Sequence, residues 1–509
     1  MTDAERTIAE MAEALAARDA EIATLRRSLK ERDQDLAMAK LKIDSLARRL
    51  FGRSSEKLSP GQLGLLEGME VPPAEVPDDE ATHETPPEKR RKSGHGRSRA
   101  PKDLPRQRVV HELPEEQRKC RCCGEAMQPF AEDVTEEIDV VPAKAFVVEH
   151  VRPKYSCRKC QEGVEQAPMP PRPIEKGLAG PGLLAQVLVS KYVDHLPLAR
   201  QSGMFRRFGI EFARSTLCDW VAACVDELGP IVEVIRRDVR ASRVVQADET
   251  PIVTLEEHDE RRRRQCWLLA FRGLGGETAF AFHKTRARDG PRAFLEGFQG
   301  YLQHDGYVGY DGLGPGIVHV GCWAHARRHF FDARPSAQKE AQEALDLIGQ
   351  LYAVERDATE LSPAERAALR RERAVPVLDA IRGRLDAWHQ DALPRSDFGK
   401  AVGYARAQWG NLVRYVEDGD VQIDNNALER EIRPVALGRR NWLFAGSYEG
   451  GHRAAALYTL VASCKAVGVE PFEYFRDVLT RTTTATAREL TPRAWKAARD
   501  AALATTPKA

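Results

Sequence analysis

Near its N-terminus the chain repeats an apolar residue at every seventh position. The residues in this register are Ile8, Leu15, Ile22, Leu29, Leu36, Ile43 and Leu50. The positions three residues later hold Met11, Leu25, Ala39 and Leu46, interrupted by Arg18 and Arg32. Sevenfold spacing over so many turns, without Pro or Gly, is typical of a coiled coil. We therefore predict a coiled coil over residues 1–56 and a homo-oligomer held by it. The alternative is a long amphipathic helix that folds back on its own chain.

The composition limits what the rest of the chain can be. With 509 residues and 42% apolar content, the chain has material for roughly three or four domains. The 77 basic and 76 acidic residues leave a net charge of +1, which excludes a uniformly basic protein and confines nucleic-acid binding to local clusters. No apolar run approaches the ~18 residues that cross a bilayer, and the N-terminus lacks a signal-peptide core. We expect a cytoplasmic protein without membrane segments.

The composition of residues 57–108 predicts a linker that is acidic in its first part and basic in its second. Between Leu58 and Glu88 there is no Lys or Arg, and acidic residues alternate with Pro. Such a composition cannot bury enough apolar surface to fold. The next residues are basic, beginning with Lys89, Arg90, Arg91 and Lys92. Two interpretations stay open here: an arm that binds DNA phosphates, or a solvated linker that pairs with its own acidic neighbour.

Two cysteine pairs lie within residues 109–172. They are Cys120 with Cys123 and Cys157 with Cys160. A gap of two residues lets both thiolates of a pair reach one tetrahedral Zn²⁺, and a domain of this size depends on the metal to fold. The intervening segments 136–142 and 145–152 are rich in Val and Ile and favour strands. We predict a zinc ribbon with one structural Zn²⁺, in which Cys122 is an alternative ligand that breaks the spacing.

Residues 173–240 favour helices separated by short turns. The predicted helices cover 183–192, 198–208 and 215–228. Ser215 is a candidate N-cap of the last one. This order fits a helix-turn-helix that binds DNA, and its candidate phosphate contacts are Arg206, Arg207 and Arg214. The alternative is a pair of helices that only packs, since many such pairs bind nothing.

Residues 241–335 alternate between strand and helix patterns. The expected strands are 244–255, 266–272, 278–283, 301–307 and 316–321, and the expected helices are 292–299 and 323–333. This order is that of an RNase H-like α/β core, although no helix is visible between the last two strands. In that fold the first and fourth strands are neighbours. Asp248 on the first strand and Asp305 at the end of the fourth are therefore expected to meet.

Two adjacent carboxylates raise each other's pKa unless a cation lies between them. Oxygen ligands on a rigid sheet suit Mg²⁺ or Mn²⁺, and two such ions stabilise the attacking and leaving oxygens of a phosphoryl displacement. A third acid is expected within residues 421–482, after a long helical stretch over residues 336–420. Glu429 is the candidate, because it falls in the first turns of a helix for which Asn425 or Asn426 is a candidate cap.

Four segments resemble blocks of the insertion sequence family 66 transposases, a group of Asp-Asp-Glu recombinases. They are LFGRSSEK (50–57), HDGYVGY (304–310), CWAHARRHFFDA (322–333) and IDNNALEREIRPVALGRRNWLFAGSYEGG (423–451). The zinc ribbon is also similar to that family's N-terminal half. The resemblance implies that residues 336–420 are a helical insertion between the second acid and the glutamate, and it leaves residues 483–509 as a C-terminal tail. It implies a two-metal site whose acids match Asp248 in QADET, Asp305 in HDGY and Glu429 in NNALER.

Several neighbouring residues are alternatives or accessories to these acids. Asp311 is an alternative second acid, although its DG pair favours a turn. Glu249 is expected on the opposite face of its strand from Asp248, and Glu431 on a different helix face from Glu429, because two residues span about 200°. The candidate phosphate clamps flanking the acids are Arg327, Arg328, Arg430, Arg433, Arg439 and Arg440. Any of these arginines is otherwise an ordinary surface residue.

Cys322 and His325 have metal-ligand spacing but no second pair nearby in sequence. They are interpreted as a signature that positions the following helix, or as groups close to the catalytic pocket, with zinc binding the less favoured alternative.

Together these features predict a DNA transposase that binds the ends of an insertion sequence and performs Mg²⁺-dependent strand cleavage and transfer. Its expected partners are double-stranded DNA, further copies of itself and, as the resemblance implies for some elements, accessory proteins. The alternatives are a non-enzymatic DNA-binding regulator, a nuclease without joining activity, or a degenerate transposase. The first leaves the acids of the C-terminal half unexplained.

Overall fold

The computed structural model describes residues 145–156, 164–175, 177–256 and 259–505, together with short helical stretches near the N-terminus and Cys122. Contacts divide the chain into two compact units, residues 1–52 with 151–509, and residues 53–150. Almost every element below belongs to the first unit. Of the predicted coiled coil, residues 21–25 are helical and Ile22 and Leu25 are exposed. The rest of the seam and the predicted linker lie largely or wholly outside the described residues.

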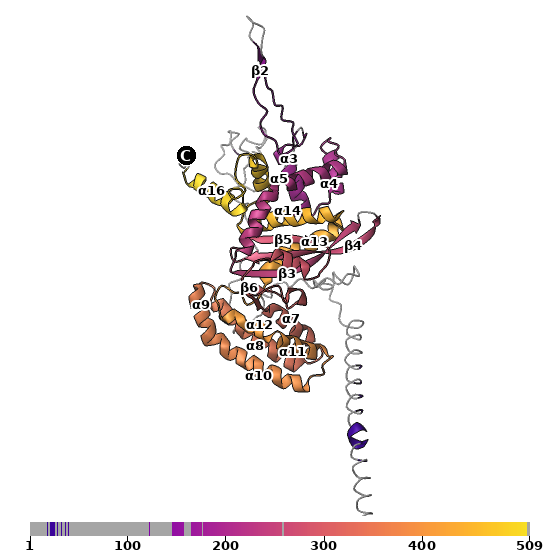
Figure 1. The fold of residues 1–509 in the computed structure, drawn as a ribbon, viewed down its shortest axis with the longest axis vertical. Helices are drawn as coiled ribbons and strands as arrows, with labels where there is room; N and C mark the ends of the chain where they lie inside the picture. Colours follow the sequence, from indigo (N-terminus) through magenta and orange to yellow (C-terminus); the bar gives the residue numbers. More distant parts are fainter. Residues whose placement is uncertain are drawn as a thin grey trace, which may run out of the picture. The chain divides into compact units, whose positions relative to one another are not determined.

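A five-stranded mixed sheet forms the centre of the first unit (Figure 1), in the order β5-β4-β3-β6-β7. Its strands are β3 (Val244–Glu256), β4 (Asp259–Gly273), β5 (Thr278–His283), β6 (Gly300–Gln303) and β7 (Ile317–Val320). The first three form an antiparallel meander, and β6 and β7 run parallel to β3. The predicted meander and the predicted pairing of the first and fourth strands are confirmed.

Two local predictions in this region were wrong. β6 ends at Gln303 instead of continuing to residue 307, because Gly306 adopts a φ of +90° and the Asp305 carboxylate accepts a hydrogen bond from the Tyr307 amide at 2.9 Å. These contacts make a turn where a strand was expected. The preceding helix, α6, spans Asp289–Phe294 rather than 292–299.

Helices cover both faces of the sheet. Directly opposed residues of an antiparallel pair share a face, so Asp248, Ala270 and Phe280 lie on one side. Helix α14 (Tyr448–Ala466) packs on that side, where the Thr459 hydroxyl accepts from the Phe280 amide at 2.9 Å. A Cβ on Gly451 would lie 2.4 Å from the Phe282 ring, so this helix approaches the sheet only with glycine there. On the other side, Phe294 of α6 stacks on Phe271.

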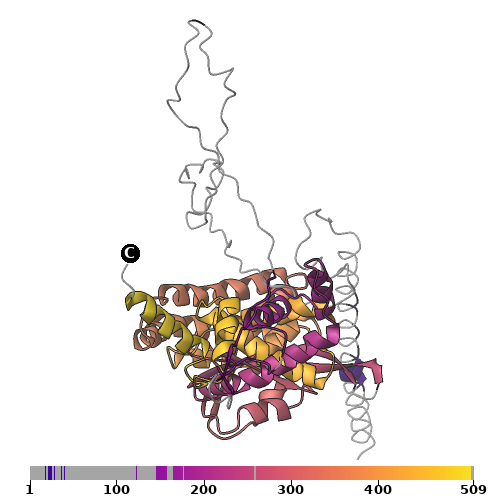
Figure 2. The ribbon, with the colours of Figure 1, turned by 90° about the horizontal axis from the view of Figure 1, so that it is seen from above.

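The helices that precede the sheet are α3 (Pro181–Tyr192), α4 (Leu198–Arg206) and α5 (Arg214–Arg240). They confirm the predicted order, although α5 continues through Pro230 well beyond residue 228. Ser215 is not its cap: Ala213, in extended backbone, takes that position and the helix begins at Arg214. Figure 2 shows these magenta helices over the orange and yellow helices of the C-terminal part.

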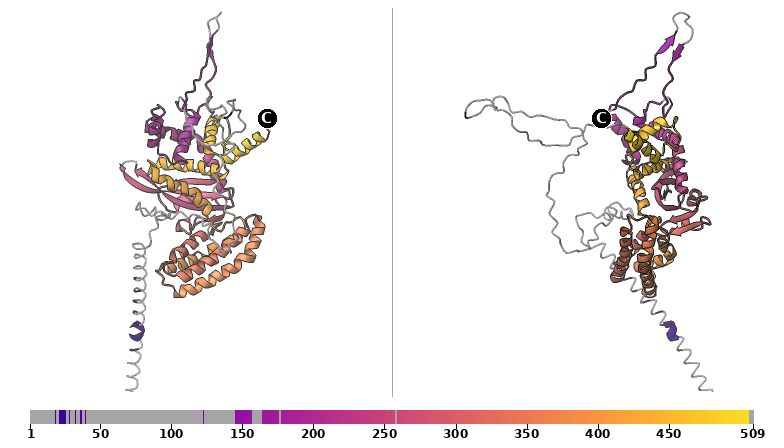
Figure 3. Two further views of the ribbon diagram at one scale, coloured as in Figure 1. Left: turned by 180° about the vertical axis from the view of Figure 1, so that it is seen from behind. Right: turned by 90° about the vertical axis from the view of Figure 1, so that its left-hand side faces the viewer.

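The residues of the predicted helical insertion form a bundle of helices, whose apolar core also includes Trp323 and Phe330 and, from the sheet, Val244 and Val320. Its helices are α8 (Gln338–Asp357), α9 (Pro363–Leu369), α10 (Val375–Asp391), α11 (Asp397–Ala407) and α12 (Trp409–Val413). Figure 3 shows them gathered beside the sheet. Arg370 is fully buried; its guanidinium pairs with Glu355 at 2.6 Å and donates to the carbonyls of Tyr415, Asp418 and Val421. This contact ties the bundle to the segment that leads back to the sheet.

In the chain, α7 (Trp323–Ala333) comes directly before the bundle and α13 (Asn426–Trp442) comes after it, while α15 (Pro471–Arg481) packs on α3. The predicted C-terminal tail is instead partly structured, because α16 (Pro492–Thr505) buries Trp495 against Tyr474, with its indole N–H donating to Asp477 at 2.7 Å. Apolar residues of the last segment therefore belong to the core.

Of the predicted zinc ribbon, the structure describes an antiparallel hairpin, β1 (Lys154–Ser156) and β2 (Val164–Gln166), on either side of the second cysteine pair. The strand expected over 145–152 is wrong, since those residues are not in a strand and the pairing begins at Lys154. Cys120, Cys123, Cys157 and Cys160 lie outside the described residues.

Candidate active site

Asp248 lies in the middle of β3, opposite Ala270 of β4. Its Oδ1 accepts a hydrogen bond from the Glu249 amide at 2.8 Å. Burial raises the pKa of the Asp248 carboxyl well above its usual range, and the negative charges of Glu249, Asp305 and Glu429 raise it further. The three predicted acids therefore lie close enough to interact, although they are far apart in sequence.

Asp305 reaches this position through the strand register. Gln246 of β3 pairs with Gln303 of β6, and the two strands are parallel. Each acid follows its glutamine by two residues, so Asp248 and Asp305 lie on the same side of this pair along the strand direction. Asp305 lies just beyond the end of β6, in the turn described above. The Tyr404 hydroxyl of α11 donates to the Asp305 carbonyl at 2.7 Å, which attaches the insertion bundle to that turn.

Glu429 lies in the first turn of α13, which packs against β3. Its Oε1 is 3.8 Å from Nδ1 of His325. Glu431, two residues later, is surrounded by Arg272 and Lys465, and burial raises the pKa of its carboxyl. The predicted difference in orientation between Glu429 and Glu431 is thus visible in their different neighbours. Asp311, the alternative second acid, is exposed. Burial lowers the pKa of His319, and the negative charge of Asp311 opposes that shift.

A pair of buried glutamines holds the segment that carries the third acid. The Gln246 amide donates to the Gln303 side chain and to the Asp424 carbonyl, both at 2.9 Å. Gln303 donates to the Gln422 carbonyl at 2.8 Å and to the Gly321 carbonyl at 3.2 Å. The two strands thereby bind the residues just before α13 directly. Sequence reasoning missed this pair. The available signal was the spacing Gln-x-Asp, which occurs both at Gln246 and at Gln303.

A thiol makes a second attachment at the start of α13. Cys322 is fully buried; its Sγ donates to Oδ1 of Asn425 at 3.0 Å and accepts from the Asn425 amide at 3.4 Å. Asn425, one of the two predicted candidates, is the N-cap residue of α13, but its side chain makes no capping hydrogen bond. Ligand atoms of Cys322, His325 and Glu429 lie within 4.8 Å of one another, a grouping that could hold a metal ion. Of the two interpretations offered for Cys322 and His325, the one that places them near a candidate acid agrees with their position beside Glu429.

Glu249 faces the other side of β3, as predicted. Its carboxylate pairs with Arg286 at 2.5 Å and accepts from the Tyr310 hydroxyl at 2.8 Å. Arg286 also lies over the Tyr307 ring, 3.9 Å from its centroid. Arg286 was not among the predicted site residues, and no sequence motif pointed to it.

The predicted DNA-binding arginines occupy different environments. Arg206, Arg207, Arg214, Arg430, Arg433 and Arg440 are exposed, and Arg327 and Arg328 are half-buried. Arg439 instead donates to the Thr250 hydroxyl at 3.0 Å and the Pro251 carbonyl at 2.8 Å, so it anchors α13 on β3. Lys89, Arg90, Arg91 and Lys92 lie outside the described residues.

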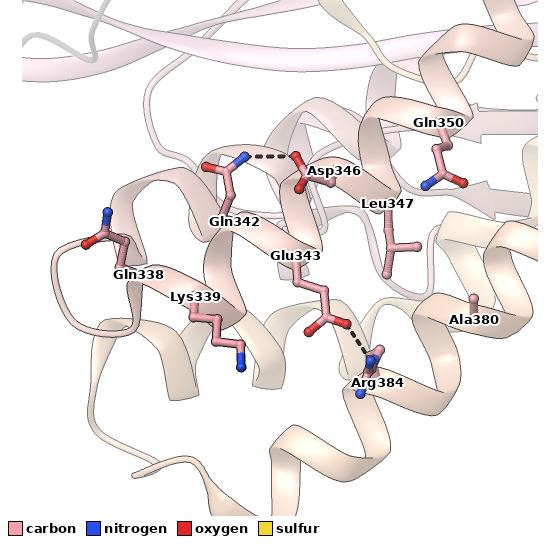
Figure 4. A pocket seen from close by; sticks show the side chains of 9 residues that line it. All are labelled: Gln338, Lys339, Gln342, Glu343, Asp346, Leu347, Gln350, Ala380 and Arg384. Carbon is pink, nitrogen blue, oxygen red and sulfur yellow. Dashed lines mark hydrogen bonds and ion pairs between the residues drawn. The ribbon is translucent and has the colours of Figure 1, made fainter.

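The insertion bundle carries a groove on its surface (Figure 4). It has a volume of about 780 Å³ and lies between α8 and α10, where Glu343 and Arg384 form an ion pair at 2.6 Å. Its lining is mixed polar and apolar, and it contains none of the predicted site residues. Over the described residues, no helix is both long and apolar enough to cross a membrane.

Comparison with known families matches nearly the whole chain. The family described as "Transposase IS66 family" matches residues 176–453. The zinc-finger binding domain of transposase IS66 matches residues 117–161, and the IS66 C-terminal element matches residues 459–491. Residues 39–109 match the family described as "Transposase C of IS166 homeodomain".

Similar proteins occur in Sinorhizobium fredii (strain NBRC 101917 / NGR234). The uncharacterized protein y4jD is 33% identical over 89% of this chain and 93% of its own length. The uncharacterized proteins y4hP and y4qI are 34% and 35% identical, each over 71% of this chain and 70% of their own length. The family matches establish that this chain belongs to the IS66 family of transposases.

Proposed function

We propose that this protein is an active transposase that cuts the ends of an insertion sequence and joins them to target DNA. The observation that carries the proposal is the convergence of Asp248, Asp305 and Glu429. Three acids drawn from separate segments are costly to collect in a half-buried position, as the raised pKa of Asp248 indicates. Such a cost is expected where the acids serve a bound cation.

The proposed catalytic core is RNase H-like. The order β5-β4-β3-β6-β7, with three antiparallel strands followed by two parallel ones, supports this assignment. In the proposed scheme residues 241–335 and 421–482 form the core, residues 336–420 the insertion, and residues 173–240 the DNA-binding helices. The exposed Arg206, Arg207 and Arg214 would contact phosphates.

The donor set fits hard divalent cations. Asp248, Asp305 and Glu429 offer only carboxylate oxygens, which Mg²⁺ and Mn²⁺ prefer. Two such ions, when bound, would activate the attacking hydroxyl and stabilise the leaving oxygen of a phosphodiester. The protein's own contribution is to hold the three carboxylates: the Asp305 turn, the β3 register and the buried glutamines each restrict one of them. No covalent protein intermediate is required.

The N-terminal half is proposed to hold the DNA. One Zn²⁺ bound by Cys120, Cys123, Cys157 and Cys160 would order the finger, and the basic arm would contact phosphates. The coiled coil would join copies of the chain, so that two element ends are held in one complex.

The test is cleavage of labelled DNA carrying the ends of the protein's own element, with Mg²⁺ present. The wild type is expected to cut at the ends, and Glu429→Gln is expected to bind the same DNA without cutting. Glu431→Gln is the matched control, because it makes the same change two residues away among different neighbours. Cleavage by Glu429→Gln at the wild-type rate would refute the assignment of the third acid. Binding by every variant without cleavage would favour the non-enzymatic regulator.

A further inference from the structure

Three different ligand atoms gather beside the carboxylates. Cys322 directly precedes α7, His325 lies in the first turn of that helix, and Glu429 lies in the first turn of α13. The sulfur, the imidazole nitrogen and the carboxylate oxygen all lie within 4.8 Å of one another. The three residues come from segments about a hundred positions apart in the chain, which is why the sequence showed only an incomplete Cys-x-x-His set.

Two buried polar atoms at this point lack hydrogen-bond partners among the described residues. One is Nδ1 of His325, and the other is Nδ2 of Asn425. The distance of 3.8 Å from His325 Nδ1 to Glu429 Oε1 is too long for a hydrogen bond. A buried nitrogen without a partner costs about 1–3 kcal/mol. Both orphaned atoms adjoin the same cluster, which suggests a missing occupant.

The Asn425 amide indicates what form of Cys322 that occupant would favour. The backbone N–H of Asn425 already points at Sγ, at 3.4 Å. If the side-chain amide were rotated by half a turn, Nδ2 would replace Oδ1 beside the sulfur, and two N–H groups would then donate to it. Two donors aimed at one sulfur stabilise a thiolate, and such outer contacts are typical of metal-bound ligands. The rotation would also satisfy Nδ2.

We propose that Cys322, His325 and Glu429 bind one Zn²⁺ ion, with a fourth position open to water. A thiolate, an imidazole and a carboxylate are the ligand types that Zn²⁺ takes, whereas Mg²⁺ avoids sulfur. This site would be distinct from the four-cysteine finger.

Glu429 would belong both to this zinc site and to the proposed catalytic centre, so zinc binding would affect cleavage. A carboxylate engaged by Zn²⁺ is withdrawn from the Mg²⁺ ions of the proposed catalytic centre, so Zn²⁺ would inhibit cleavage. Zinc binding itself does not depend on the proposed function, but this inhibition does rest on it.

The test counts zinc in the full-length protein. Metal-free protein is loaded with Zn²⁺, freed of unbound metal by gel filtration and analysed by mass spectrometry. The wild type is expected to hold about two ions per chain, one in the finger and one here. His325→Gln and Cys322→Ser are each expected to hold about one. His329→Gln, one turn later on α7, and Cys464→Ser, a buried cysteine of α14, are the matched controls and should keep the wild-type number.

Each outcome decides the proposal. Equal zinc in the wild type and His325→Gln would overturn it. His325 is only partly buried, so its variant should fold even if Cys322→Ser does not, and circular dichroism of the metal-free proteins checks this. In a second assay, Zn²⁺ at ten times its dissociation constant should reduce end cleavage by the wild type about tenfold, and reduce it less in His325→Gln. If no protein cleaves DNA, the proposed function fails while the zinc count still decides the site.

Discussion

Replacing Gln303 by Met tests whether the buried glutamines position the third acid. The Gln303 side chain is fully buried and makes three hydrogen bonds, donating to the Gln422 and Gly321 carbonyls and accepting from Gln246. Met has a similar length but no amide. Gln246 keeps its second acceptor, the Asp424 carbonyl, so the substitution leaves two carbonyls without this donor.

The cost follows from those two groups. A buried polar group left without a partner costs about 1–3 kcal/mol, which gives roughly 2–6 kcal/mol for two. Burial of the apolar Met side chain offsets about 1 kcal/mol of this. We expect a decrease in the free energy of unfolding of about 1–5 kcal/mol, a substantial part of the 5–15 kcal/mol typical of a domain. Because residues 421–425 lose an attachment to β6, Glu429 should also shift, and a displacement of about 1 Å can cost a hundredfold in rate.

The assay combines urea unfolding with DNA-end cleavage at a temperature where the variant stays folded. Gln299→Met is the matched control, since it makes the same change at an exposed glutamine shortly before β6. The double variant Gln246→Met with Gln303→Met should cost less than the sum of the single variants, because the two amides share one hydrogen bond. Equal urea midpoints for Gln303→Met and Gln299→Met, or full cleavage activity in a destabilised Gln303→Met, would refute the reasoning.

Three further predictions concern other groups. Asp248→Asn should abolish cleavage but make the metal-free protein more stable than the wild type above about pH 4. The folded-state pKa of Asp248 is raised, so the stability of the wild type is fully present below the unfolded pKa and is lost as pH rises through the folded pKa. Thermal unfolding as a function of pH checks this, and an identical pH profile for both proteins would contradict it. Arg370→Met should cost about 3–5 kcal/mol by leaving the Glu355 carboxylate unpaired, and adding Glu355→Gln should recover part of that loss in urea unfolding; strictly additive effects would rule out the coupling. Cys123→Ala should remove the zinc of the finger and weaken DNA-end binding, measured by metal analysis and gel shift, whereas unchanged zinc would point to Cys122 as the ligand.

Much of the fold followed from local patterns. The strands of the meander, the helices before it and the long insertion were predictable because apolar periodicity is a local property of the chain. The pairing of β3 with β6 was predictable only through the order of elements. The predicted ends of elements were wrong where one local conformation decided them, as at Gly306 after β6 and at Ala213 before α5. The segment predicted as a C-terminal tail contains a helix, because Trp495 packs against Tyr474.

The sequence by itself determined which acids, cysteines and secondary-structure elements the protein has, and the family resemblance singled out Asp248, Asp305 and Glu429 among many carboxylates. Only the tertiary structure decided how these residues meet. Gln246 and Gln303 bind the segment before α13, and Cys322 binds Asn425, across more than a hundred intervening residues. No local pattern specifies such contacts, because a buried amide or thiol acquires its partner only when distant segments pack together. The same packing places His325 beside Glu429 and so creates a candidate metal site that the sequence alone left incomplete.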